Sequence, residues 1–281
     1  MKSRSANEVR RCRPLLGTFV EITAGGPANA PLPAAVEAAF AVVERLQRLL
    51  SVHDPASEIS LLNREALRRP VRVSPDTFTL LQRGLALAEA SAGAFDFTIA
   101  PTLARWGLRD KSLARARAGD WRSVRLLRGA RVRFTRPAAL DLGGIAKGFA
   151  VDAAIDALRA AGVEAALVNA GGDVRVFGPR PFVIHLRHPV HPGWLPRALP
   201  LSNAALATSA PCFTQRRWRG QQVSHLVNPR GQRAVTGPIS VTIRARECWL
   251  ADALTKVVLN APQRAERLLD QHEAEAFILT A

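Results

Sequence analysis

Segments with a helical apolar repeat alternate with strand-like segments along most of the chain, and glycine-rich corners join them. The helical repeat is found at 33–51, 75–92, 144–161, 247–259 and 262–271, with a short helix opened by Ser57. Strand patterns are found at 15–23, 132–134, 164–170, 172–178, 181–187, 239–245 and 275–281. This order predicts an α+β (mixed α/β) fold, in which helices flank mixed sheets and the strand ends feed the glycine-rich corners. Residues 109–130 are expected to form a surface excursion, and 187–200 have no clear pattern.

The 281 residues suffice for one large domain over 1–281, or for a domain built as two closely packed halves. A run of about 18 apolar residues is missing, so we expect no insertion into a membrane. The N-terminal segment has no apolar stretch of the kind that a signal peptide or a lipoprotein signal needs, which favours a cytoplasmic protein. Cys12, Cys212 and Cys248 lie too far apart in the sequence to indicate a zinc site or a disulfide framework.

The formal net charge of +16 comes almost wholly from arginine, because lysine occurs only at Lys2, Lys111, Lys147 and Lys256. Such a charge favours nucleic acid, an anionic surface or a phosphate-bearing ligand. The arginines are scattered, however, and lack the interleaved aromatic residues of a single-strand binding groove. We therefore expect no nucleic-acid partner; a solvated basic surface and a phosphate ligand both remain compatible with the charge.

The corner DLGGIAKGFAVD, from Asp141 to Asp152, places two glycines directly before an amphipathic helix. Free N–H groups at a helix start, with Lys147 nearby, form a natural site for phosphate oxygens. Gly143 and Gly144 would let the backbone approach a ligand or expose a carbonyl to a cation. The alternative is an ordinary strand-to-helix turn with an exposed lysine.

Three other corners carry polar residues. Asn169 and Asp173 flank a Gly-Gly pair that would also suit a plain hairpin turn. Asp96 lies in GAFDFTIAP, expected to be a loop after a helix. His225, in VSHLVNPRG, would serve as an acid or as a donor to a phosphate, or would be structural.

Asp252 lies within the apolar helical segment WLADALTKVVL. A carboxylate within an apolar stripe is costly unless it is paired or bound to a cation. Asp252 is therefore the best candidate for a metal ligand on physical grounds alone.

These corners occur in a familiar order. The motifs are PLLGTFVEI, SEISLLN, GAFDFTIAP, DLGGIAKGFAVD, ALVNAGGD, ALATSA, SHLVNPRG and LADAL. Over residues 14 to about 260 the chain resembles the ApbE family of FAD:protein FMN transferases. The resemblance implies an ApbE-like fold with a flavin cleft at the loop-rich strand ends. Members use Mg²⁺ to cleave the FAD pyrophosphate and join FMN by a phosphoester to a Thr or Ser hydroxyl of a target protein, and some hydrolyse FAD instead.

The resemblance also implies roles for individual residues. Flavin contacts are expected at Leu16, His53, Ala94, Phe95, Asp96, Asp141 and Lys147, to which we add Asn169 and Asp173 from the Gly-Gly corner. His225 is expected to contact the flavin nucleotide and to act in catalysis with Asp141 and Lys147. Mg²⁺ is expected at the Gly144 carbonyl and at Asp252. The acceptor's proton would go to Asp141, Asp173 or His225.

The sequence also departs from the family pattern at several positions. Lys256 stands where a further metal ligand, Thr, is common, and an ammonium cannot ligate Mg²⁺. It would either point away or replace part of the cation's role at the phosphates. Leu16 replaces a Met, His53 an aromatic residue and Asn228 an Asp. The alternatives that remain are an FAD pyrophosphatase, which yields FMN and AMP, and an FAD-binding protein without catalysis.

Overall fold

The computed structural model describes residues 7–116 and 119–281, and its largest sheet is antiparallel throughout. The strand order is β1-β2-β6-β7-β10-β15-β16. The strands are β1 (Asn7–Leu15), β2 (Thr18–Gly26), β6 (Ala165–Ala170), β7 (Asp173–Phe177), β10 (Ala205–Ser209), β15 (Ile239–Ala245) and β16 (Glu275–Thr280). With the helices that flank this sheet, the arrangement confirms the predicted α+β class.

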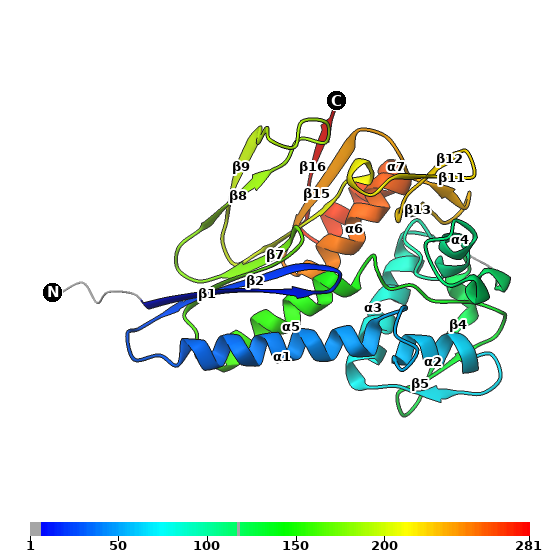
Figure 1. The fold of residues 1–281 in the computed structure, drawn as a ribbon, viewed down its shortest axis with the longest axis horizontal. Coiled ribbons are helices and arrows are strands. Elements are labelled where there is room, and N and C mark those ends of the chain that lie inside the picture. The colour runs from blue at the N-terminus through cyan, green and yellow to red at the C-terminus, as the bar shows by residue number, and fades with distance from the viewer. Residues whose placement is uncertain (1–6, 117–118) are drawn as a thin grey trace.

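Three helices cover one face of this sheet, namely α1 (Leu32–Leu50), α5 (Ala146–Ala160) and α6 (Cys248–Asn260) (Figure 1). Alternate strand residues such as Ile22 and Val168 are fully buried against them, as the two-residue period of a strand requires. On the opposite face, a hairpin of β8 (Phe182–Leu186) and β9 (Arg197–Leu201) forms a smaller apolar cluster with the sheet. The central strands of the sheet, such as β7 and β10, are therefore buried on both faces.

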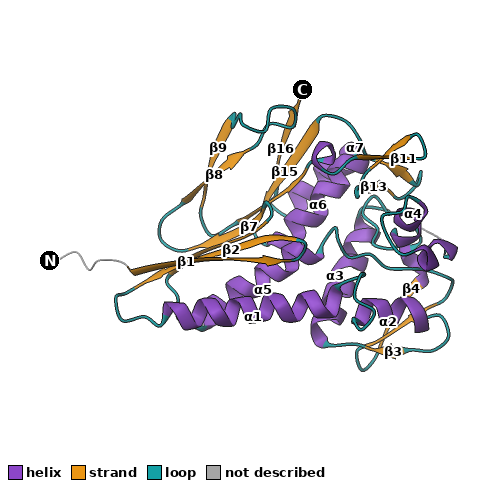
Figure 2. Ribbon diagram, in the orientation of Figure 1, coloured by secondary structure: helices purple, strands orange, loops and turns teal. Residues whose placement is uncertain are grey.

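A second group of elements packs beside the ends of α1 and α5 (Figure 2). It includes the helices α2 (Glu58–Glu65), α3 (Pro75–Ala90) and α4 (Ala100–Arg105), with a sheet of β3 (Val71–Arg72), β4 (Val124–Leu127) and β5 (Arg131–Phe134). Two short hairpins follow: β11 (Arg216–Trp218) with β12 (Gln221–Val223), and β13 (Val227–Asn228) with β14 (Arg233–Ala234). Helix α7 (Pro262–Gln271) precedes β16, and 3₁₀ turns occur at Lys111–Arg115, Trp121–Ser123 and Pro211–Phe213.

The predicted helix starts are confirmed, since the Ser57 and Ser74 side chains accept the N–H groups of Ser60 and Thr77 as N-caps. The strand predicted over 15–23 was wrong at its start, because Leu16 and Gly17 form a two-residue turn between β1 and β2. Strand β1 had escaped prediction because it is a mostly exposed edge strand rich in arginine, without an apolar alternation.

The surface excursion predicted over 109–130 was also wrong in part. It contains two 3₁₀ turns and β4, whose Val124 is buried in the main core. Residues 93–101 were expected to form a loop, but helix α4 begins within that segment, at Ala100.

The basic end 1–6 of the predicted N-terminal segment lies outside the described residues, as do 117–118. None of the helices within the described ranges combines the length and apolarity that a bilayer crossing requires.

Helices α5 and α6 cross at unusually short range. A Cβ placed on Gly148 of α5 would lie 2.4 Å from the carbonyl oxygen of Cys248. Asp152, one turn further along α5, accepts the N–H groups of Cys248 at 2.8 Å and Trp249 at 2.9 Å and so caps α6 from a neighbouring helix. The pKa of Asp152 is raised to about 6, first by burial, against the lowering effect of Arg175 and the two N–H groups. This crossing fixes where the rest of α6 lies.

The crossing predicts that Gly148→Ala destabilises the protein. Alanine normally favours a helix over glycine, so without the close contact the change would stabilise by up to about 1 kcal/mol. Because the added Cβ would clash with the Cys248 carbonyl, we expect the free energy of unfolding to fall by about 1–3 kcal/mol. Denaturant unfolding measures this free energy. Gly193→Ala serves as the control, because a Cβ at position 193 has no atom within 4 Å. A Gly148→Ala protein at least as stable as wild type would contradict the crossing.

Candidate active site

A cavity of about 1120 Å³ opens at the end of the main sheet where the β1–β2 turn, the β6–β7 turn and the end of β10 meet. It is lined by every predicted site residue except Asp173 and Asp252, namely Leu16, His53, Ala94, Phe95, Asp96, Asp141, Gly144, Lys147, Asn169 and His225. Its volume exceeds the range of roughly 300–1,000 Å³ that is usual for drug-sized ligands. A ligand as large as a dinucleotide is compatible with this space.

Two tight turns form one wall. Leu16 has φ +56° and its N–H donates to the Gln47 side chain on α1, which holds the hairpin tip against the cavity. Gly171 and Gly172 both have positive φ and join β6 to β7, so the plain hairpin turn foreseen as an alternative is correct. A Cβ on Gly171 would lie 2.5 Å from the Thr18 hydroxyl, so the two turns touch.

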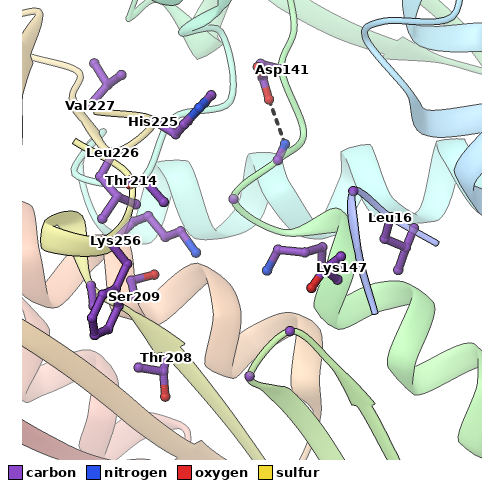
Figure 3. A pocket seen from close by; sticks show the side chains of 18 of the residues that line it. Leu16, Asp141, Lys147, Thr208, Ser209, Thr214, His225, Leu226, Val227 and Lys256 are labelled. Carbon is purple, nitrogen blue, oxygen red and sulfur yellow. Dashed lines mark hydrogen bonds between the residues drawn. The ribbon is translucent and has the colours of Figure 1, made fainter. Parts of the chain in front are cut away.

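On the other side, Asp141 is held in place through both of its oxygens. The N–H of Gly143 donates to one oxygen at 2.7 Å (Figure 3), and the Arg109 guanidinium contacts the other at 2.6 Å. Arg109 also lies 3.4 Å from the Nδ1 atom of His225. The three side chains form a connected row along the cavity, in which Asp141 is already ionically paired.

His225 is solvent-accessible at the end of this row, and its pKa is lowered from the ordinary value of 6.5. Burial is the main cause and the Arg109 cation adds to it, while Asp141 opposes it. The ring is therefore neutral at neutral pH and able to take up a proton.

Asp96 reaches the cavity wall, but its carboxylate mainly supports the surrounding loops. One oxygen accepts the N–H and the hydroxyl of Thr98, each at 2.7 Å, and the other accepts the N–H of Trp121 at 3.2 Å. Burial raises the pKa of Asp96 to about 6 despite these hydrogen bonds.

The remaining two predicted residues, Asp173 and Asp252, lie behind the cavity wall at 1% and 0% exposure. Each is covered by a lysine that does line the cavity: Lys147 contacts Asp173, and Lys256 contacts the Oδ1 atom of Asp252. In Figure 3 the side chains of Lys147 and Lys256 extend into the cavity toward one another. We call these four residues the charge cluster.

The charge cluster is electrostatically balanced. Burial works against the ammonium of Lys147, but Asp173 and Asp252 outweigh it and hold the pKa of Lys147 above its ordinary value. Burial and the neighbouring Asp252 raise the pKa of Asp173 to about 6, against the lowering effect of Lys147 and Lys256. For Asp252 burial is again the largest influence, but Lys256 and Lys147 together lower its pKa. The two carboxylates and two ammoniums sum to zero charge at neutral pH.

The magnesium ion expected at Gly144 and Asp252 does not fit this arrangement. Lys256 engages Oδ1 of Asp252, and the N–H of Gly148 donates to Oδ2 at 3.3 Å. A Cβ on Gly144 would lie 3.3 Å from Cε of Lys256, so the lysine packs against one expected ligand residue while its ammonium engages the carboxylate of the other. Two unit charges about 4 Å apart interact by roughly 4 kcal/mol at an effective dielectric of about 20, and a divalent ion doubles that repulsion.

Arg109 is the main residue that sequence reasoning missed. It follows α4 in the segment interpreted as a surface excursion, yet its side chain is only 10% exposed. The available signal was indirect, since a buried Asp141 needs a cationic partner and no sequence spacing points to position 109. Among the described residues, no group of three or more His, Cys, Asp or Glu side chains is placed to hold a metal ion.

The fold and this cavity define an α+β protein with a dinucleotide-sized site lined by cationic side chains. A sequence model of the ApbE family matches residues 16–278, so the chain belongs to the ApbE family. The FAD:protein FMN transferase of Rhodobacter capsulatus is 31% identical over 254 residues, which are 85% of this chain and 49% of that protein. The chain thus spans about half the length of that relative. The FAD:protein FMN transferase of Klebsiella pneumoniae (strain 342) is 27% identical over 263 residues, covering 86% and 80% of the two chains.

Solved structures agree with the fold. The ApbE protein of Thermotoga maritima superposes with a TM-score of 0.87 at 26% identity, covering 98% of this chain and 94% of that one. The apo form of the Pseudomonas stutzeri flavinyl transferase ApbE gives a TM-score of 0.83 at 21% identity, covering 100% and 93%. The second likeness concerns the fold alone.

The row of Arg109, Asp141 and His225 predicts a titration. We expect the pKa of His225 to lie below 6.5 in the wild type and to rise in Arg109→Gln, since a nearby cation is removed and Asp141 loses its partner. An NMR titration of the histidine ring protons measures both values, and the exposed Arg125→Gln variant serves as control. Equal His225 pKa values in the wild type and in Arg109→Gln would show that Arg109 does not act on the imidazole.

Proposed function

We propose that this protein is an FAD:protein FMN transferase, which cleaves the pyrophosphate of FAD and joins FMN to a Thr or Ser hydroxyl of a target protein. One observation carries the proposal: a single cavity brings together the Asp141–Arg109–His225 row and the two cavity-facing lysines. The names of the relatives from Rhodobacter capsulatus and Klebsiella pneumoniae support the same activity.

The lining of the cavity suits the parts of FAD. Leu16, Ala94 and Phe95 offer an apolar wall to a flat isoalloxazine ring. Arg109, Lys147 and Lys256 also line the cavity and offer cationic groups to the pyrophosphate. Such pre-positioned donors stabilise the negative charge that develops on the phosphate oxygens during cleavage.

In the proposed step, the acceptor hydroxyl oxygen attacks the phosphorus on the FMN side of the pyrophosphate. A new P–O bond to the Thr or Ser oxygen forms, and the P–O bond to the AMP phosphate breaks. AMP leaves with the electron pair, and the hydroxyl proton passes to a base of the enzyme. Hydrolysis would follow the same path with water in place of the acceptor.

His225 is the base that the geometry favours among the three candidates. Both oxygens of Asp141 already accept hydrogen bonds, from Gly143 and Arg109. Asp173 is nearly fully buried beneath Lys147. The imidazole of His225 is neutral at neutral pH and solvent-accessible at the cavity surface, so it can receive the proton and later return it to solvent.

His225→Ala tests this assignment. We expect FAD to bind within a few-fold of wild type, while AMP release in the presence of the acceptor falls by about 10²–10⁴-fold, the usual contribution of a general base. Flavin fluorescence measures binding and chromatography of the nucleotides measures release. His272→Ala, at the exposed C-terminal end of α7, is the matched control. Full AMP release by His225→Ala would exclude His225 as the base.

The same assay separates transfer from hydrolysis. Purified protein is incubated with FAD and with a threonine-bearing target domain, and the mass of the target domain is measured by mass spectrometry. A covalent FMN adduct formed together with AMP is the expected result. AMP and free FMN without an adduct would identify an FAD pyrophosphatase, and unchanged FAD would identify a binding protein.

A further inference from the structure

We propose that the ammonium of Lys256 is a built-in cation that replaces the divalent metal ion, so that this protein handles the FAD pyrophosphate without Mg²⁺. The inference rests on the proposed function for the identity of the ligand. It concerns the charge cluster of Lys147, Asp173, Asp252 and Lys256, and what the cluster presents to the cavity.

The position of Lys256 is the first argument. It lies one helical turn after Asp252 on α6, and its side chain is 15% exposed, on the cavity side. Its Cε atom is in contact distance of Gly144, the start of the glycine corner before α5. The lysine side chain therefore packs against Gly144 while its ammonium engages Asp252, so it stands beside both residues that would otherwise hold a cation.

The hydrogen bonds of Lys256 leave it one donor for a ligand. An ammonium has three N–H groups and accepts nothing. Lys256 donates to the Oδ1 atom of Asp252 and, at 2.9 Å, to the backbone oxygen of the same residue. Because Lys256 lines the cavity, the third N–H is available for a phosphate oxygen bound there.

Charge balance is the second argument. Asp173 and Asp252 are fully matched by Lys147 and Lys256, so the cluster offers no excess negative charge to attract a divalent ion. A bound pyrophosphate would bring negative charge of its own, and Lys147 and Lys256 extend into the cavity toward one another (Figure 3). Their ammoniums could therefore donate to phosphate oxygens without a metal ion.

Metal dependence of FAD binding tests the proposal directly. Wild-type protein is titrated with FAD by fluorescence in excess EDTA and in excess MgCl₂, and AMP release is followed under both conditions. We expect the dissociation constant and the rate to be the same with and without Mg²⁺. A large loss of FAD affinity in EDTA that Mg²⁺ restores would overturn the proposal, and this arm needs no variant.

Lys256→Thr supplies the converse test. It removes the ammonium and frees Asp252, so in EDTA we expect FAD affinity to fall by about 10–100-fold, the loss of one charge-assisted hydrogen bond, and Mg²⁺ to restore it. Lys256→Arg keeps the charge and should remain metal-independent. Lys111→Thr, the same change at an exposed lysine, is the matched control. A Lys256→Thr protein that binds FAD in EDTA as tightly as wild type would contradict the proposal.

The outcomes also separate this inference from the proposed function. Suppose that FAD binds tightly with an affinity that EDTA does not change, but that no AMP is released under any condition. This result would contradict the transferase and still support Lys256 as the built-in cation. AMP release and an FMN adduct that both require Mg²⁺ would support the transferase and contradict the role of Lys256.

Discussion

The burial of two aspartates side by side is the constraint on which the centre of this structure depends. Asp173 on β7 and Asp252 on α6 are nearly inaccessible to solvent, and a buried carboxylate without a partner is strongly destabilising. Removing one partner of a buried ion pair typically costs about 3–5 kcal/mol. Lys147 from α5 therefore pairs with Asp173 and ties α5 to the sheet, while Lys256 pairs with Asp252 within α6.

The helix crossing at Gly148 makes this arrangement possible. It brings α6 close enough for the N–H of Gly148 to reach Asp252, while Asp152 holds the start of α6 through two backbone N–H groups. The same lysines that neutralise the buried carboxylates form the cationic wall of the cavity. Structural need and ligand recognition are thus met by the same two side chains, Lys147 and Lys256.

Local patterns predicted much of the fold and of the site wall, because helix periodicity, N-caps and glycine corners depend on neighbouring residues. The α+β class, the caps at Ser57 and Ser74 and several residues of the glycine corners that line the cavity follow from such patterns. Leu16, His53 and Ala94 were expected from the family resemblance alone. What depends on distant partners did not: Arg109 beside Asp141 is 32 positions away in sequence. Strand β1 was missed for a different reason, since its arginines face solvent at a sheet edge and leave no apolar alternation.

A crystal structure of the protein with FAD, grown with Mn²⁺ in place of Mg²⁺, tests the central claim that the charge cluster receives the pyrophosphate without a metal ion. The account predicts pyrophosphate oxygens within hydrogen-bonding distance of Lys147 and Lys256, with the isoalloxazine ring between Leu16 and Phe95. It also predicts no anomalous signal of manganese between Gly144 and Asp252. A manganese peak at that position, with Lys256 turned away from Asp252, would contradict it.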